Sequence, residues 1–368
     1  MVLRPKNFAK APANENQSPA ASRAVPSSKG LVSRLGLADA SHRRRSKTSG
    51  MTRTTKYAIE QAKRRNDMAK KAAKSPMVFK VTRAPAVNDV VMGDSSSSPQ
   101  AKVTQLHLPK ELGRPEYKEI DKEVIGAIDA TAADTDIEYI REGLESISTD
   151  LAMSLTCTKI QTTRNELPKE LTVIVNDMCS ILPTHVLAIF DGQAIRADPA
   201  RPRKVTLYPA HSLVLAANCA HMPKPPATLP VPVHQKGEQE VTLPVWSLAL
   251  PSPLTYPHLS VYLYTKRVEH LMGMMLPSPP PADWLEKKEE RVLSYAKRLS
   301  QTFTVQALTM HIYGVHGLWQ NVCTMGIFDT RLWDALDWMW ATLLTALAIA
   351  TGEPGLMIPS ASEQQQEQ

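Results

Sequence analysis

The sequence predicts an α+β protein in which a small sheet with helices is followed by a C-terminal helical bundle and preceded by a long disordered basic arm. Three observations support this fold class. Residues 1–80 contain 19 Lys and Arg against 4 Asp and Glu (net +15), whereas the rest of the chain contains 24 against 32 (net −8). Short β-branched segments occupy the middle of the chain, and apolar residues at helical spacing fill its last third. The apolar fraction of 43% is enough for at least one core.

The basic arm covers residues 1–105. It is rich in Pro, Ser and Ala, has few aromatic residues, and closes with a Ser-rich linker at residues 93–99. Such a segment cannot bury enough apolar surface to offset the conformational entropy that folding removes. The folded region is therefore expected to start near Leu106.

Basic residues within the arm form clusters typical of nuclear import signals or phosphate-binding patches. Three interpretations stay open: nuclear import, direct contact with nucleic acid, and a solvated arm without a specific partner. No leucine heptads follow the clusters, which excludes a zipper-type DNA reader. A phosphate on Ser75, which precedes a proline, would offset the nearby lysine charge, so Ser75 is a candidate phosphorylation site. The candidate import residues are Arg43, Arg44, Arg45, Lys63, Arg64, Arg65, Lys70 and Lys71.

Residues 106–183 are expected to form a helical lead-in. Apolar residues recur at three- and four-residue steps between residues 134 and 160, and Asp134 or Thr135 is placed to cap this helix. Residues 171–182 also have helical spacing, but their β-branched residues leave helix and strand both open.

Residues 184–276 are expected to form the α+β segment. The apolar residues 186–190, the Asp191-Gly192 turn and residues 193–196 have the pattern of a tight hairpin. Prolines in the later strand limit it to an edge or bulged position. The remaining elements expected here are a strand over residues 204–208, a helix over residues 212–219 and a strand over residues 241–250.

This segment resembles a BTB/POZ domain. The strand, turn and strand are followed by Ala-His-Ser-Leu-Val-Leu-Ala-Ala at residues 210–217 and by Tyr-Leu-Tyr-Thr at residues 262–265. In that family an A-H-x-x-V-L-A-A segment opens a core helix and an L-x-Y-L-Y-T-like segment ends another. The inserted residues 198–203 and several nearby prolines depart from the family pattern, which puts its usual homodimer and cullin surfaces in doubt.

Residues 277–352 are expected to form the helical bundle. Asp283 can cap a first helix, residues 303–322 continue with helical spacing, and Asp329 can cap a last helix that ends at Gly352. The last helix is strongly apolar from residue 338 to residue 350, but a span needs about 20 apolar residues. It is therefore expected to be a core or partner-facing helix, and residues 353–368 are expected to be a disordered polar tail.

Four short segments in a wider part of the chain carry a second resemblance: residues 248–253, 262–267, 317–322 and 332–337. They resemble the clampless-type proteins of mushroom-forming fungi, which regulate clamp-cell formation and sexual development. The resemblance implies a role in clamp-cell formation and in the dikaryotic cell cycle, exerted through protein partners such as transcription factors. It also suggests a candidate interaction surface made of Trp319, Asn321, Trp333 and Asp337.

Motifs for catalysis are missing from the sequence. It has no glycine-rich phosphate loop and no serine elbow, and the spacing of His311, His316 and Cys323 does not place all three on one helix face. We therefore expect no enzyme activity, no cofactor and no metal. Four scattered cysteines and the lack of an apolar run at the start indicate a reducing, intracellular compartment.

The expected function is that of a non-enzymatic nuclear regulator that acts through protein–protein interaction. Two alternatives from other classes stay open. The basic arm would make the protein a direct binder of DNA or chromatin, with an affinity that falls steeply as salt rises. The BTB/POZ resemblance would instead make it an adaptor for a cullin-type ubiquitin ligase.

Overall fold

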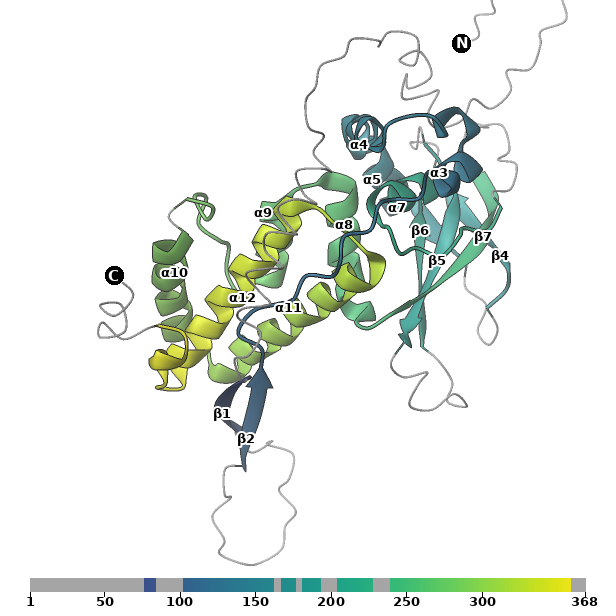
Figure 1. The fold of residues 1–368 in the computed structure, drawn as a ribbon. Helices are drawn as coiled ribbons and strands as arrows, with labels where there is room; N and C mark the ends of the chain where they lie inside the picture. Colours follow the sequence, from purple (N-terminus) through teal and green to yellow (C-terminus); the bar gives the residue numbers. More distant parts are fainter. Residues whose placement is uncertain are drawn as a thin grey trace, which may run out of the picture.

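The computed structural model describes residues 76–83, 102–161, 167–176, 181–192, 204–227, 239–286 and 288–358. A sheet with its helices forms one part of the molecule, and helices from the C-terminal third form the other (Figure 1). This arrangement confirms the predicted α+β class with a C-terminal helical region. The candidate import residues in the arm and the candidate phosphorylation site Ser75 lie outside the described residues.

The sheet has five strands in the order β3-β4-β7-β5-β6. The pairing of β5 with β7 is parallel, and every other pairing is antiparallel. The strands are β3 (Thr158–Ile160), β4 (Glu170–Val175), β5 (His185–Asp191), β6 (Val205–Ala210) and β7 (Gln239–Leu250).

Strand β7 is the central strand, so the expectation that prolines confine it to an edge or a bulge is wrong. Its first half, residues 239–244, pairs with β4, and its second half, residues 245–250, pairs with β5. Pro244 lies where the pairing changes from one neighbour to the other. The next amide, that of Val245, donates to the Lys169 carbonyl at 2.8 Å. The donor that proline lacks therefore costs the sheet at most a terminal ladder bond.

The predicted tight hairpin at Asp191-Gly192 is also wrong. Strand β5 pairs with β6 along one edge and with β7 along the other. Residues 193–196 lie outside the described residues, and both edges of residues 186–190 are occupied by β6 and β7. The antiparallel partner of β5 is β6, which confirms the strand predicted over residues 204–208.

The predicted helical lead-in needs two corrections. One helix was expected over residues 134–160, but the chain breaks at Ile147 into two helices and then enters strand β3. The cap is Asp136, whose Oδ1 accepts from the Glu138 amide at 2.9 Å, instead of Asp134 or Thr135. Residues 170–175 form a strand, because Leu171, Val173 and Val175 alternate into a buried cluster beneath the sheet.

Among the described residues, five helices accompany the sheet. The helix predicted over residues 212–219 is confirmed as α7, and its described side chains are all buried. The set consists of α3 (Lys122–Ile128), α4 (Ile137–Ser146), α5 (Ser148–Thr156), α7 (Ser212–Asn218) and α8 (Tyr256–Thr265), with short 3-10 turns at Ala130–Ala132 and Pro253–Thr255.

The C-terminal part consists of α9 (Val268–Met275), α10 (Lys288–Thr302), α11 (Val305–Met325) and α12 (Thr330–Ala350). Helix α12 packs against α9, α10 and α11, which explains its apolar sequence. Asp329 caps it and Gly352 adopts a left-handed conformation after it, as predicted. Asp283 does not cap α10, which begins five residues later, and instead pairs with Arg291 on that helix. Among the described residues, no helix combines the length and apolarity required to span a membrane.

The predicted boundaries of the folded part are wrong at both ends. Strands β1 (Met77–Arg83) and β2 (Lys102–Leu108) pair antiparallel, and β1 and the start of β2 lie within the expected arm of residues 1–105. They are held because Phe79 is fully buried and Met77 nearly so, in the same core as α11 and α12. The expected tail of residues 353–368 begins with a 3-10 turn, Pro354–Leu356, that packs against α12.

Candidate interaction site

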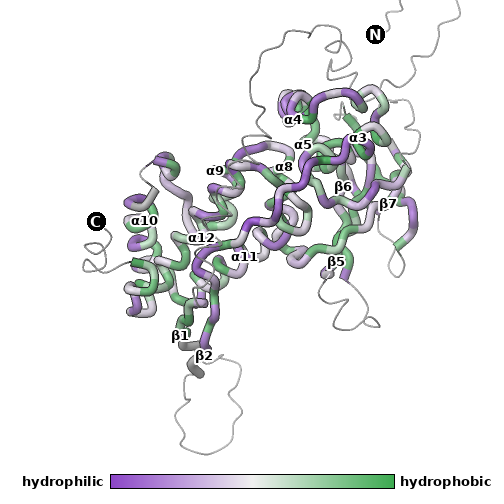
Figure 2. The backbone as a smooth tube through the Cα atoms, viewed as in Figure 1, coloured by the Kyte–Doolittle hydropathy of each residue, from purple (hydrophilic) through white to green (hydrophobic). Residues whose placement is uncertain are grey.

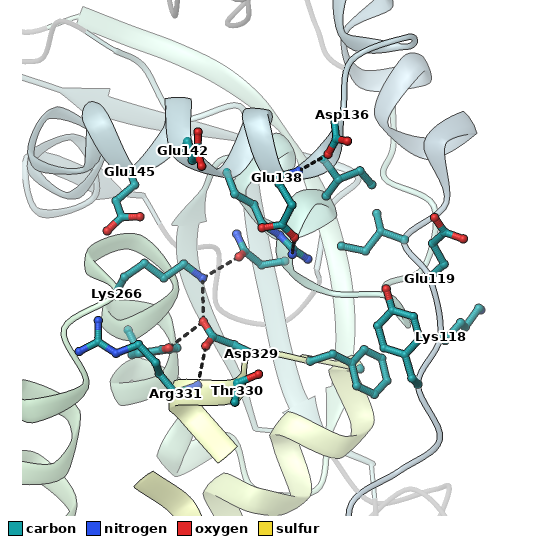
Figure 3. A pocket seen from close by; sticks show the side chains of 18 of the residues that line it. Lys118, Glu119, Asp136, Glu138, Glu142, Glu145, Lys266, Asp329, Thr330 and Arg331 are labelled. Atoms are coloured by element: carbon teal, nitrogen blue, oxygen red, sulfur yellow. Dashed lines mark hydrogen bonds and ion pairs between the residues drawn. The ribbon is translucent and has the colours of Figure 1, made fainter. Parts of the chain in front are cut away.

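A cavity of about 660 Å³ lies between helix α4 of the sheet part and the start of α12 of the C-terminal part. We call it the junction pocket (Figure 3). The end of α8 forms its floor. Its main lining residues are Tyr117, Glu119, Glu138, Arg141, Glu142, Glu145, Asn218, Tyr262, Lys266, Phe328, Asp329 and Arg331.

Lys266 is the centre of the floor. Its Nζ donates to Asn218 Oδ1 at 2.6 Å and lies 3.7 Å from Asp329 Oδ2 and 5.4 Å from the centre of the Tyr262 ring. The Tyr262 hydroxyl donates to the same carboxylate oxygen of Asp329 at 2.8 Å. The other oxygen of Asp329 accepts from the Arg331 amide and so caps α12. One carboxylate therefore joins the end of α8 to the start of α12.

The backbone at Lys266 is unusual as well. Lys266 follows the last turn of α8 with φ at 54°, and it is the only described residue other than glycine with a positive φ. Such a conformation strains a residue that has a Cβ. The strain is tolerated here because the turn aims the lysine side chain at Asn218 and Asp329.

Burial sets the charge states of this network. Burial lowers the pKa of Lys266, and the nearby Asp329 carboxylate partly opposes that change. Burial raises the pKa of Tyr262 strongly, and Asp329 raises it further, so the phenol stays protonated and acts as a donor. The polar groups of the floor therefore form their hydrogen bonds and ion pair with one another.

The wall opposite the floor carries carboxylates. Glu138, Glu142 and Glu145 lie at i, i+4 and i+7 on one face of α4, while Ile140 and Leu144 on the other face are buried. Figure 3 shows Glu145 extending from α4 toward the Lys266 side of the pocket.

The three glutamates differ in their partners. Arg141 pairs with Glu138 at 2.6 Å, and its Nε donates to the Ala217 carbonyl at 2.7 Å. Glu142 and Glu145 are exposed. The α4 side of the pocket therefore carries exposed carboxylates above a neutralised floor, whereas the exposed cations Lys118, Lys122 and Arg331 line other parts of it.

An irregular segment at residues 109–121, which we call the strap, completes the pocket. It leads from β2 across α11 and α12 to α3, and most of its path is hydrophilic (Figures 1 and 2). At its pocket end, the Tyr117 ring packs edge-on against Phe328 with 5.1 Å between centroids.

The four residues of the predicted interaction surface do not form one exposed patch. Trp333 and Asn321 have no exposed area. Asn321 binds the Ser252 backbone through both ends of its amide, and the Trp333 indole donates to the Ile327 carbonyl. These two residues belong to the core in this conformation.

The other two, Trp319 and Asp337, hold the strap. The Trp319 indole donates to the Gly113 carbonyl at 2.7 Å, and Asp337 pairs with Arg114 at 2.5 Å. Arg114 lies outside every motif in the sequence, and no motif indicates the role of Lys266. The Tyr-Leu-Tyr-Thr-Lys-Arg segment quoted for the clampless resemblance contains Lys266, but its spacing alone does not indicate a pocket.

The described residues contain no group of three or more His, Cys, Asp or Glu side chains arranged to hold a metal ion. The candidate set His311, His316 and Cys323 is divided. His311 contacts the Met275 carbonyl through Nδ1, whereas His316 packs between the rings of Trp319 and Trp340.

Comparison with known families assigns both parts of the chain. Residues 115–251 match the Clampless protein 1 N-terminal domain, and residues 269–368 match the Clampless protein 1 C-terminal domain. The junction pocket draws its lining from both regions. No curated protein and no solved structure matches the chain. The BTB/POZ resemblance therefore stays a prediction. The two matches support a role in clamp formation and development, and the chain belongs to the clampless protein 1 family.

Proposed function

We propose that this protein is a non-enzymatic regulator of clamp-cell formation and dikaryotic cell-cycle progression that acts in the nucleus through protein–protein interaction. We further propose that the junction pocket is its recognition site and accepts a basic segment of a protein partner. The observation that carries the proposal is a floor whose polar groups bind one another, together with the exposed Glu142 and Glu145 carboxylates on the α4 side of the rim.

The chemistry of the pocket favours binding. Lys266 and Tyr262 are both engaged with Asp329, and burial keeps Tyr262 protonated, so these groups act as a rigid base for the pocket. Glu142 and Glu145 project from α4 on the rim, where Lys or Arg side chains of a partner can reach them. The Tyr117 and Phe328 rings at one end offer a surface for the stem of such a side chain.

Charge reversal on the rim tests this site. We expect the double variant Glu142→Lys/Glu145→Lys to weaken binding of a labelled Lys/Arg-rich peptide about tenfold, because two attractive contacts become repulsive. Fluorescence anisotropy at low and at physiological salt measures the affinity. Glu290→Lys, an exposed site on α10 away from the pocket, is the matched control. Equal affinities for all three proteins would contradict the proposed site.

Nuclear delivery is the second part of the proposal and rests on the basic clusters of the arm. We expect Lys63→Ala/Arg64→Ala/Arg65→Ala to lower the nuclear share of a fluorescent fusion. Unchanged localisation of this variant, together with that of a version lacking residues 1–75, would contradict nuclear import through the arm.

A further inference from the structure

The strap is attached to α11 and α12 as a bound peptide would be. Residues 109–114 make no backbone-to-backbone hydrogen bond within the described part of the chain. Two of their carbonyls instead accept hydrogen bonds from tryptophan indoles. Trp340 donates to the Pro109 carbonyl at 3.1 Å, and Trp319 donates to the Gly113 carbonyl at 2.7 Å. No sheet pairing among the described residues holds this stretch in place.

Two side chains of the strap supply the remaining contacts. Leu112 is 3% exposed and joins the core of the C-terminal helices. Arg114 lies 2.5 Å from Asp337 and 3.6 Å from Asp334, which follow each other at i and i+3 on α12. The guanidinium also lies 5.2 Å from the centre of the Trp333 ring. A planar cation that meets two carboxylates and an aromatic face is a specific form of arginine recognition.

We infer that the face of α11 and α12 beneath the strap is a receptor for an extended segment with the chemistry Leu-x-Arg, and that the chain's own strap occupies it in this structure. A protein partner that presents a leucine two positions before an arginine would use the same two indole donors and the same carboxylates. This surface is separate from the rim of the junction pocket, so the inference goes beyond the proposed function.

When a segment of a partner protein displaces the chain's own strap, the junction pocket changes as well. Residues 117–120 at the far end of the strap line that pocket, so release of Arg114 loosens one of its walls. In the intact chain a free peptide competes poorly, because the tethered strap has an effective concentration of the order of millimolar.

The test uses the full chain and a labelled synthetic peptide of residues 108–116. We expect Arg114→Ala to bind the peptide at least tenfold more tightly than the unaltered chain, because its own strap has lost the ion pairs. The control Arg291→Ala removes a separate ion pair on α10 and should bind as weakly as the unaltered chain.

Peptide variants test the recognition chemistry. A peptide with Ala in place of Arg114 should lose binding. A peptide with Ala in place of Gly113 should keep it, because the space around that Cβ is open. Melting curves of each protein show whether the fold is kept. If Arg114→Ala fails to fold, Arg114→Lys takes its place, since it keeps the charge but loses the planar guanidinium that lies over the Trp333 ring. A folded variant that binds no better than the control would overturn the inference.

Discussion

Burial keeps two histidines of this protein, His185 and His211, uncharged. His185 and His211 have no exposed area. The His211 ring lies 3.2 Å from Ser154 Oγ and 3.2 Å from the Tyr264 hydroxyl, and His185 Nε2 lies 2.9 Å from the Pro226 carbonyl. Burial lowers the pKa of His185 and lowers that of His211 to about 3. Both rings are therefore neutral in the folded protein at physiological pH.

These shifts predict that stability falls in mild acid. The unfolded chain takes up a proton at each histidine below its ordinary pKa of about 6.5, whereas the folded chain does not. Above pH 6.5 the contribution is fully present. Between pH 6.5 and about 3, His211 alone lowers the free energy of unfolding by about 1.4 kcal/mol per pH unit, and His185 adds to this just below pH 6.5.

Denaturant unfolding at pH 7.5 and pH 5.5 measures this effect. His211→Gln should reduce the difference between the two pH values, because one titrating group is lost. Gln306→Ala, which removes no titrating group and lies at an exposed position on α11, should leave the difference unchanged. A free energy of unfolding that is the same at both pH values in the unaltered chain would show that the prediction is wrong.

At the scale of elements, the left-handed conformation of Gly326 ends α11 and positions the backbone hydrogen bonds made there. Gly326 follows α11 with φ at 67° and donates to the Cys323 carbonyl. Its own carbonyl accepts from the Ala220 amide at 3.0 Å, which ties the end of α11 to the residues after α7. A Cβ at this position would lie 2.7 Å from the His221 ring.

Gly326→Ala is therefore expected to destabilise the fold more than Gly352→Ala. Both positions have a positive φ, so both variants carry the strain of a left-handed alanine, about 1 kcal/mol. Only Gly326 adds a steric clash, because nothing lies within 4 Å of a Cβ at Gly352. We expect Gly326→Ala to cost at least about 1 kcal/mol more in the free energy of unfolding. Equal losses would mean that His221 moves aside without cost.

At the scale of the whole molecule, Asp329 and the strap connect the sheet part to the C-terminal part. Asp329 at the start of α12 binds Tyr262 and Lys266 at the end of α8, and the strap carries the chain from β2 across the C-terminal helices to α3. The junction pocket exists because of these two connections. We expect a substitution at either connection to destabilise both parts of the molecule.

A double-mutant cycle with Lys266→Met and Asp329→Asn measures the first connection. We expect a coupling energy of about 1–3 kcal/mol, because both side chains are largely buried and the Tyr262 hydroxyl holds the Asp329 carboxylate in place. The exposed pair of Arg331 and Glu269, 3.5 Å apart, is the matched control and should couple by less than about 1 kcal/mol. Urea unfolding of the four proteins in each cycle supplies the values. Similar coupling in both cycles would mean that Asp329 contributes mainly as a helix cap.

Local sequence patterns by themselves determined much of this protein: the α+β class, the helices near residues 212–218, 305–325 and 330–350, the Asp329 cap and the glycine that ends the last helix. These features depend on residues close together in the chain, whose periodicity and capping chemistry act locally. The resemblance to the clampless family also came from short segments and is confirmed by the family match.

Only the tertiary structure decided the rest. It showed that β7 is central, that β5 pairs with β6, that Met77–Arg83 is a strand, and that Trp319 and Asp337 hold a segment some 200 residues away. Pairing between distant strands and docking of an irregular strap leave no periodic trace in the sequence. The same reason hid the junction pocket, since Lys266 and Asp329 become neighbours only when the two parts of the molecule pack together.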